Sequence, residues 1–142
     1  MQLTRHTDYS LRVLMFLSLQ KNNSLATIGD VARNFNIPKN NLSKVVQQLA
    51  KLGYVKTVRG KNGGICLAQS PDAMNLSTII QSVENNIEVI NCQKPACPLI
   101  SQCALKGALN EAQHAFFGTL EKYSLADISR QSEKIKNLLN WV

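Results

Sequence analysis

Apolar residues recur at helical spacing near the start of the chain and predict an amphipathic first helix over residues 8–20. Thr7 and Asp8 are the expected N-terminal caps of this helix. A second helix is expected to begin at Thr27, which can form a capping box with Asp30. Each helix has a single apolar face, so the two helices need partners in a common core.

A third apolar stripe follows a break at Asn36 and Pro38, and its members are Leu42, Val45, Val46, Leu49 and Leu52. The other faces of this predicted helix are polar. Two helices joined by a short turn, the second with a polar face, are typical of a helix-turn-helix, whose second helix enters the DNA major groove. Asn and Gln can pair with adenine edges, and Lys can contact phosphate or guanine. The expected DNA contacts are therefore Lys39, Asn40, Ser43, Lys44 and Gln47.

Two short strand-like runs come next, over residues 54–58 and 65–68, around an Arg-Gly-Lys-Asn-Gly-Gly tip. Glycine permits the positive φ angles of a tight hairpin turn, so the pattern predicts a β-hairpin, or wing. Arg59, Lys61 and Asn62 lie at the tip and are expected to contact DNA phosphates or a minor groove. A solvated hairpin tip and a solvated helix face are the alternatives for each feature taken alone.

The distribution of charge favours DNA binding over these alternatives. The chain has a formal charge of +7. Residues 1–70 hold ten Lys and Arg against two Asp and Glu, a balance of +8, whereas residues 71–142 hold six against seven, a balance of −1. A cationic module beside a near-neutral one indicates a part that binds a polyanion and a part with another task.

The C-terminal half is predicted to be helical around one irregular loop. Residues 76–83 form a short helix candidate capped by Asn75 or Ser77, and Ser124 can cap a last helix with Trp141 as a candidate anchor. Between them, apolar positions spaced by three and four residues predict a helix that two copies could share, with a seam of Leu105, Leu109, Ala112, Phe116, Thr119 and Tyr123. An ordinary amphipathic helix packed on its own domain is the alternative.

Together these elements predict a mainly α fold with a small β hairpin. We expect a winged helix-turn-helix over residues 1–75, whereas residues 76–142 hold dimerisation helices and an irregular loop, whose three cysteines indicate a cluster-binding site. A chain of 142 residues can bury one sizeable core but not two large domains. Neither a signal peptide nor a transmembrane run is visible, which predicts a cytoplasmic protein.

Cys92, Cys97 and Cys103 lie in a stretch that Pro95 and Pro98 keep from being helical. Closely spaced thiols in a reducing compartment indicate a metal site more than a disulfide framework. The spacing is wider than that of most zinc-binding pairs and favours an iron-sulfur cluster, although zinc and inert or redox-active thiols remain open. Three thiolates leave one ligand unassigned, and the candidates are Cys66, His6, His114, Asp8 and several Glu residues.

An enzyme is disfavoured because the chain has only two histidines and no evident nucleophile and base pairing. A small electron-carrying protein, with a basic surface that docks an acidic partner, is a rival of another class. Within the DNA-binding class, the alternatives are a zinc-stabilised regulator and a regulator that senses iron or redox state with a 2Fe-2S cluster.

Several motifs resemble a family of winged-helix iron-sulfur transcription regulators, and in particular its nitric-oxide-sensing repressors. The resemblance covers essentially the whole chain, and its most specific parts are the wing tip and the cysteine triplet. The matching segments are Met1-Gln2-Leu3-Thr4, Thr7-Asp8-Tyr9, Gly53-Tyr54-Val55, residues 58–64, the three cysteines and Tyr123-Ser124-Leu125-Ala126-Asp127.

This resemblance implies a homodimer that represses genes at a double-stranded DNA operator and leaves it when nitric oxide attacks the cluster. It also implies a 4Fe-4S cluster bound by Cys92, Cys97, Cys103 and by Asp8 of the partner subunit, with Arg12 steadying that carboxylate. A related regulator of cluster biogenesis uses a histidine three residues after the last cysteine. Lys106 occupies that position here, which counts against a 2Fe-2S centre held in the same way.

Overall fold

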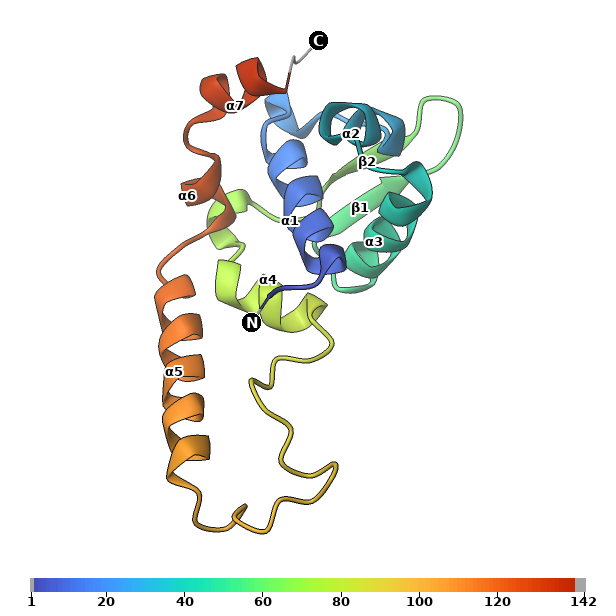
Figure 1. Cartoon of the computed structure of the whole chain (residues 1–142). Helices are drawn as coiled ribbons and strands as arrows, with labels where there is room; N and C mark the ends of the chain where they lie inside the picture. The colour runs from blue at the N-terminus through green and yellow to red at the C-terminus, as the bar shows by residue number, and fades with distance from the viewer. Residues whose placement is uncertain (1, 140–142) are drawn as a thin grey trace.

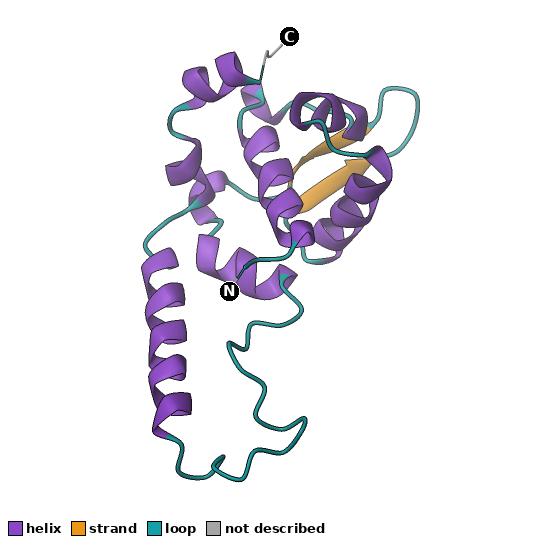
Figure 2. Cartoon of the chain, viewed as in Figure 1, coloured by secondary structure: helices purple, strands orange, loops and turns teal. Residues whose placement is uncertain are grey.

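The computed structural model describes residues 2–139, so Trp141 lies outside the described residues. The chain is mainly helical with one two-stranded antiparallel sheet, which confirms the predicted fold class (Figure 1, Figure 2). None of the described helices combines the length and apolar character needed to cross a bilayer. The elements are α1 (Arg5–Ser18), η1 (Lys21–Asn23), α2 (Ile28–Phe35), α3 (Lys39–Lys51), β1 (Val55–Val58), β2 (Gly64–Leu67), η2 (Pro71–Ala73), α4 (Leu76–Val83), α5 (Ala104–Leu120), α6 (Leu125–Ser129) and α7 (Ser132–Leu138).

Helix α1 lies at the centre of the molecule and packs against α2, α3, α4, α6 and β2 (Figure 1). Its buried apolar residues are Val13, Leu14, Phe16 and Leu17. The helix begins at Arg5, and Thr4 caps it by accepting a hydrogen bond from the Thr7 N–H. The predicted start at residue 8 and the predicted caps Thr7 and Asp8 are therefore wrong. Asp8 lies inside the helix, where Arg12 binds it.

Helices α2 and α3 form the helix-turn-helix. The predicted capping box is confirmed, since Asp30 N donates to Thr27 Oγ1 at 3.1 Å and Thr27 N donates to Asp30 Oδ2 at 2.8 Å. Asn36 ends α2 in the left-handed conformation, and α3 starts after Pro38. Four of the five predicted stripe residues of α3 are buried: Leu42, Val45, Val46 and Leu49. Leu52 is not part of the core, because it follows the end of the helix and is 38% exposed.

Strands β1 and β2 form the predicted hairpin, with Val55 opposite Leu67 and Val58 opposite Gly64. A bridge between Ala26 and Ile65, with hydrogen bonds of 3.0 and 2.7 Å, ties the hairpin to the segment before α2. This bridge explains Gly64, because a Cβ atom there would lie 2.5 Å from the Ala26 carbonyl oxygen. The base of the wing is thus fixed to the helix-turn-helix, the part of the chain that we call the DNA reader.

The second half of the chain shares the core of the first half. Met74, Ile79, Val83 and Leu125 are buried in the same cluster as α1 and α3. Leu76 N donates to Tyr123 O at 2.9 Å, and Leu125 N donates to Met74 O at 2.8 Å, so the segments before α4 and after α5 are joined. Helix α5 extends away from this junction (Figure 1). The division of the chain at residue 75 stays a prediction.

Glu84 joins the end of α4 to the start of α1. Its Oε2 accepts hydrogen bonds from Thr4 N and Thr4 Oγ1, both at 3.1 Å, and from Thr7 Oγ1 at 2.6 Å. Burial works against the charged carboxylate, but the bonds from Thr7 and Thr4 outweigh it and hold the pKa of Glu84 below its ordinary value. A carboxylate here also complements the positive end of the α1 dipole.

We expect Thr27→Ala to lower the free energy of unfolding by about 1 kcal/mol, because α2 loses its N-cap. Urea denaturation of the full chain measures this change. Thr78→Ala is the matched control, since Thr78 is exposed on α4 and its backbone N–H keeps its bond to Asn75. Equal losses in the two variants would show that the capping box contributes nothing specific.

Glu84→Gln should lower the free energy of unfolding at pH 7 by about 1 kcal/mol, because three donors lose a charged acceptor. The contribution of ionised Glu84 is complete above the ordinary glutamate pKa of about 4.3 and is lost as the pH falls through the lower pKa of the folded protein. The difference between wild type and variant should therefore shrink in acid. A difference that is constant with pH in urea denaturation contradicts this assignment.

Candidate DNA interface and cysteine loop

Helix α3 presents a polar face that is free of the core. Lys39, Asn40, Lys44 and Gln47 are all exposed, as the sequence predicts. Ser43 is half-buried, and its hydroxyl donates to the Lys39 carbonyl oxygen at 3.0 Å, so it is the least available of the predicted contacts. Asn41 is exposed beside Asn40 in the first turn and is a further candidate. Its place at the start of the predicted recognition helix was the available signal.

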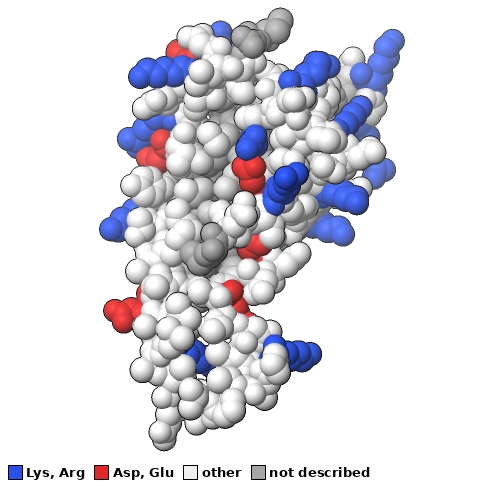
Figure 3. Space-filling model, viewed as in Figure 1, with Lys and Arg blue, Asp and Glu red and all other residues white. Residues whose placement is uncertain are grey.

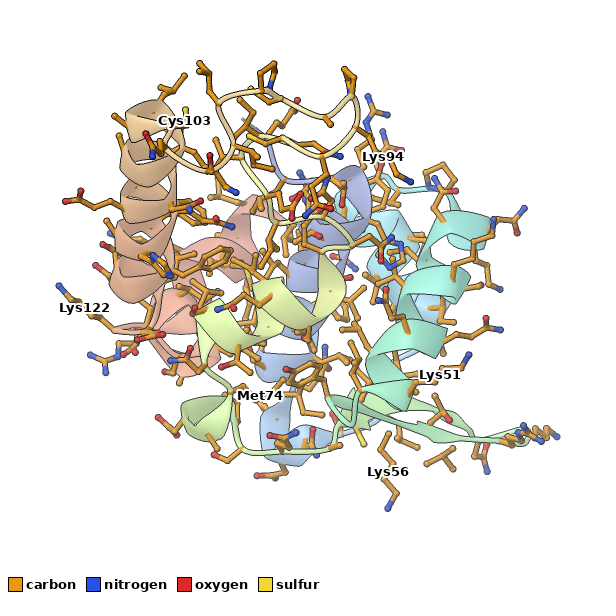
Figure 4. The ribbon with its side chains drawn as sticks, turned by 90° about the horizontal axis from the view of Figure 1, so that it is seen from below. Lys51, Lys56, Met74, Lys94, Cys103 and Lys122 are labelled. Carbon is orange, nitrogen blue, oxygen red and sulfur yellow. The ribbon has the colours of Figure 1, made fainter. Side chains whose placement is uncertain are left out.

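The wing tip adds a second polar surface. Arg59, Lys61 and Asn62 are exposed there. Lys and Arg side chains gather along the side of the molecule formed by α3 and the wing (Figure 3). Lys51 and Lys56 point outward from the end of α3 and from β1 (Figure 4). The structure therefore places the predicted DNA contacts on one cationic side.

The second glutamine of α3 is used inside the molecule. Gln48 Oε1 forms a hydrogen bond with His6 Nε2 of α1. Because His6 and Thr7 are adjacent, the first turns of α1 contact both the recognition helix and Glu84 at the end of α4. These contacts link α3 to the element that precedes the cysteine loop.

The three predicted cysteine ligands lie in an irregular segment between α4 and α5. All three are free thiols and half-buried. Cys97 N donates to Cys92 O at 3.0 Å, so a backbone turn brings these two residues together. Cys103 caps α5, and its Sγ accepts a hydrogen bond from Lys106 N at 3.4 Å. Figure 4 shows Cys103 at the start of α5, beside the loop that carries Lys94.

The donor chemistry of this segment fits an iron-sulfur cluster. Within residues 2–139, no three His, Cys, Asp or Glu side chains are grouped so that they could hold a single metal ion. The thiolates of a four-iron cluster each bind a different iron and need not converge on one point. Three half-buried thiols on one loop are the soft ligands that such a cluster requires.

The candidates for a fourth ligand have different surroundings. Cys66 is buried in β2, where it pairs with Lys56 of β1 as part of the sheet. His6 is bonded to Gln48, and His114 is exposed on α5. Asp8 is half-exposed and accepts two bonds from Arg12, with Nε to Oδ1 at 3.0 Å and Nη2 to Oδ2 at 2.9 Å. The predicted pairing of Arg12 with Asp8 is therefore present within one chain.

Helix α5 contains no buried residue. One face is half-buried toward its own chain and includes Leu109 and Phe116. The opposite, exposed face carries Leu105, Ala108, Ala112, Ala115 and Thr119. The predicted seam is thus divided between the two faces, and Tyr123 lies beyond the end of the helix.

Comparisons with known proteins agree with this architecture. The Rrf2 family, described as iron-dependent transcriptional regulators, matches residues 3–131. The HTH-type transcriptional regulator NsrR of Bacillus licheniformis is 43% identical over 99% of this chain and 100% of its own length. NsrR of Bacillus subtilis is 40% identical over 98% of this chain and 97% of its own length.

Solved structures show the same fold at lower identity. CymR, the global cysteine regulator of B. subtilis, is 22% identical with a TM-score of 0.74, over 92% of this chain and 97% of that one. IscR of T. potens is 19% identical with a TM-score of 0.76, over 94% of this chain and 90% of that one. The relatives are regulators rather than enzymes, as the sequence predicts. The chain belongs to the Rrf2 family of winged-helix transcriptional regulators.

Proposed function

We propose that this regulator is a nitric-oxide-responsive repressor that binds operator DNA as a homodimer with a 4Fe-4S cluster on each cysteine loop. The observation that carries this proposal is the position of the first turns of α1. They hold Asp8, they contact recognition helix α3 through His6, and they contact the end of α4 through Thr7. The relatives, named as HTH-type transcriptional regulators, support the DNA-binding part of this proposal.

DNA binding is supported by the cationic side of the reader. Lys39 and Lys44 on α3, with Arg59 and Lys61 on the wing, can neutralise phosphates, while Asn40 and Gln47 are free to reach base edges. Helix-turn-helix readers commonly bind two half-sites as symmetric dimers. Operator binding therefore calls for a second copy.

Dimerisation is supported by apolar surface on α5 and on the cysteine loop. Leu99 and Leu105 are 66% and 61% exposed, and Ile87, Val89, Ile90 and Ile100 are 38–43% exposed. Apolar side chains concentrated on one projecting segment mark an interaction surface. In the proposed dimer, a second copy packs along the exposed face of α5, which carries Leu105, and its α1 provides Asp8 to the cysteine loop.

Cluster binding is assigned to Cys92, Cys97 and Cys103, with Asp8 of the partner subunit as the fourth ligand. When bound, the cluster supplies iron that can react with nitric oxide. A carboxylate oxygen is a harder and weaker ligand for such iron than a thiolate, so the position held by Asp8 is the most open to a small molecule. Arg12 orients this carboxylate, because it donates two hydrogen bonds to it.

Anaerobic purification with iron and sulfide analysis, followed by nitric oxide titration with visible absorption and DNA binding recorded together, tests the proposal. Cys97→Ser should lose both bound iron and specific operator binding. Asp8→Ala should change the cluster spectrum and the nitric oxide response. Cys66→Ala is the matched control, because that thiol is buried in the sheet and should leave the cluster in place.

Three results in this experiment would be inconsistent with the proposal. A colourless, zinc-loaded wild type would favour the zinc-stabilised regulator. A reversible cluster without DNA binding at moderate salt would favour an electron carrier. Operator affinity that Cys97→Ser leaves unaltered, with no bound iron, would exclude a cluster-dependent repressor.

Lys61→Ala and Gln47→Ala should affect DNA binding in different ways. Loss of the Lys61 cation should weaken binding to all sequences and reduce the salt slope by about 1. Loss of Gln47 should cost about 1–3 kcal/mol of discrimination between operator and random DNA if its amide reads a base. Fluorescence anisotropy over a salt series measures both. Equal loss on both DNAs for Gln47→Ala would argue against base readout.

A further inference from the structure

Arg12 lies between the Asp8 carboxylate and the ring of Phe35. Its guanidinium binds Asp8 through two nitrogens, and its central carbon is 5.9 Å from the centroid of the Phe35 ring. Phe35 also contacts Phe16 edge to face, with centroids 6.3 Å apart and an interplanar angle of 65°. The half-buried Phe35 ring is thus held between a core residue and the cation that binds Asp8.

Phe35 occupies a critical place in the helix-turn-helix. It is the last residue of α2, and Asn36 follows in the left-handed conformation. Ile37 N then donates to Ala32 O at 3.1 Å, and α3 begins at Lys39. Phe35 is therefore joined directly to the short turn that precedes the recognition helix, where the predicted DNA contacts Lys39 and Asn40 lie.

We propose that Phe35 is a positioning residue that couples the Asp8 carboxylate, through Arg12, to the turn orienting the recognition helix. This inference rests on the proposed function, in which Asp8 binds the cluster. It assigns to Phe35 a task that neither DNA contact nor cluster ligation requires.

The physical basis is the double use of one planar group. A guanidinium fixed by two bonds to a carboxylate has a defined plane, and only some placements of that plane keep it over the ring. What the carboxylate binds therefore changes the free energy of the Arg12 and Phe35 contact. By thermodynamic linkage, the orientation of the turn changes the affinity at Asp8 by the same factor.

The test compares Phe35→Leu with Phe35→Tyr in the dimer of the 142-residue chain. Leucine keeps an apolar side chain at the contact with Phe16 but removes the π face, whereas tyrosine keeps that face. The quantity measured is the ratio of operator dissociation constants for cluster-free and cluster-loaded protein. A partly exposed cation–π contact corresponds to about a two- to fivefold effect on an equilibrium constant. Phe35→Leu should therefore reduce the ratio of dissociation constants by about that factor, and Phe35→Tyr should retain the wild-type ratio.

A second measurement does not depend on the cluster. A double-mutant cycle with Arg12→Gln and Phe35→Leu, followed by urea unfolding of the cluster-free protein, isolates the contact between the two side chains. The fold-change in the unfolding equilibrium constant of the double mutant should differ by about two- to fivefold from the product of the two single-mutant fold-changes. A double-mutant fold-change equal to that product would show that the two side chains do not interact, and would remove the physical basis of the coupling.

The outcomes separate this inference from the proposed function. If wild type shows no cluster-dependent change in DNA affinity, the proposed function fails. If wild type shows the change and Phe35→Leu retains the full ratio, with unchanged iron content and absorption, the coupling role of Phe35 is wrong. An equal loss of affinity in the loaded and cluster-free forms would make Phe35 a purely structural residue and would also overturn the inference.

Discussion

Burial of the apolar face of α1 is the interaction on which the arrangement of the molecule depends. Val13 and Leu14 are fully buried, and α2, α3, α4, α6 and β2 all pack on this helix. Burial of each large side chain stabilises the fold by about 1.5–3 kcal/mol. This face therefore holds the DNA reader and the second half of the chain on the same helix. The polar turns at the start of α1 consequently touch both parts, through Gln48 and Glu84.

Features that depend on neighbouring residues were predicted correctly from the sequence. The capping box at Thr27 and the cap at Ser124 need only polar side chains close in sequence, and both form, although the predicted single last helix is divided into α6 and α7. The start of α1 was wrong because Thr4 competes with Asp8 as the cap, and Thr4 is reinforced by Glu84, which is eighty residues away. The sequence pattern carries no record of that partner.

In the candidate site too, local features could be predicted from the sequence, whereas features that depend on tertiary packing could not. The cysteine spacing and the two prolines predict a non-helical loop, and the segment between α4 and α5 has none of the regular elements. The cation–π contact of Arg12 with Phe35 depends on how α1 crosses α2, and the division of α5 into two faces depends on where α4 and the loop pack. Periodicity identifies an apolar stripe but not which neighbour covers it.

Two hydrogen bonds, between Met74 and Leu125 and between Leu76 and Tyr123, join the two ends of the segment that holds α4, the cysteine loop and α5. Because both ends of this segment are fixed by these bonds, the distance between them does not depend on the length of the loop. The entropy of closing a flexible loop rises only slowly with its length, by about 0.6 kcal/mol per doubling. A change in the length of the cysteine loop therefore alters the free energy of closing it only slightly and requires no change in this junction, so loops of different length and chemistry are compatible with the same fold.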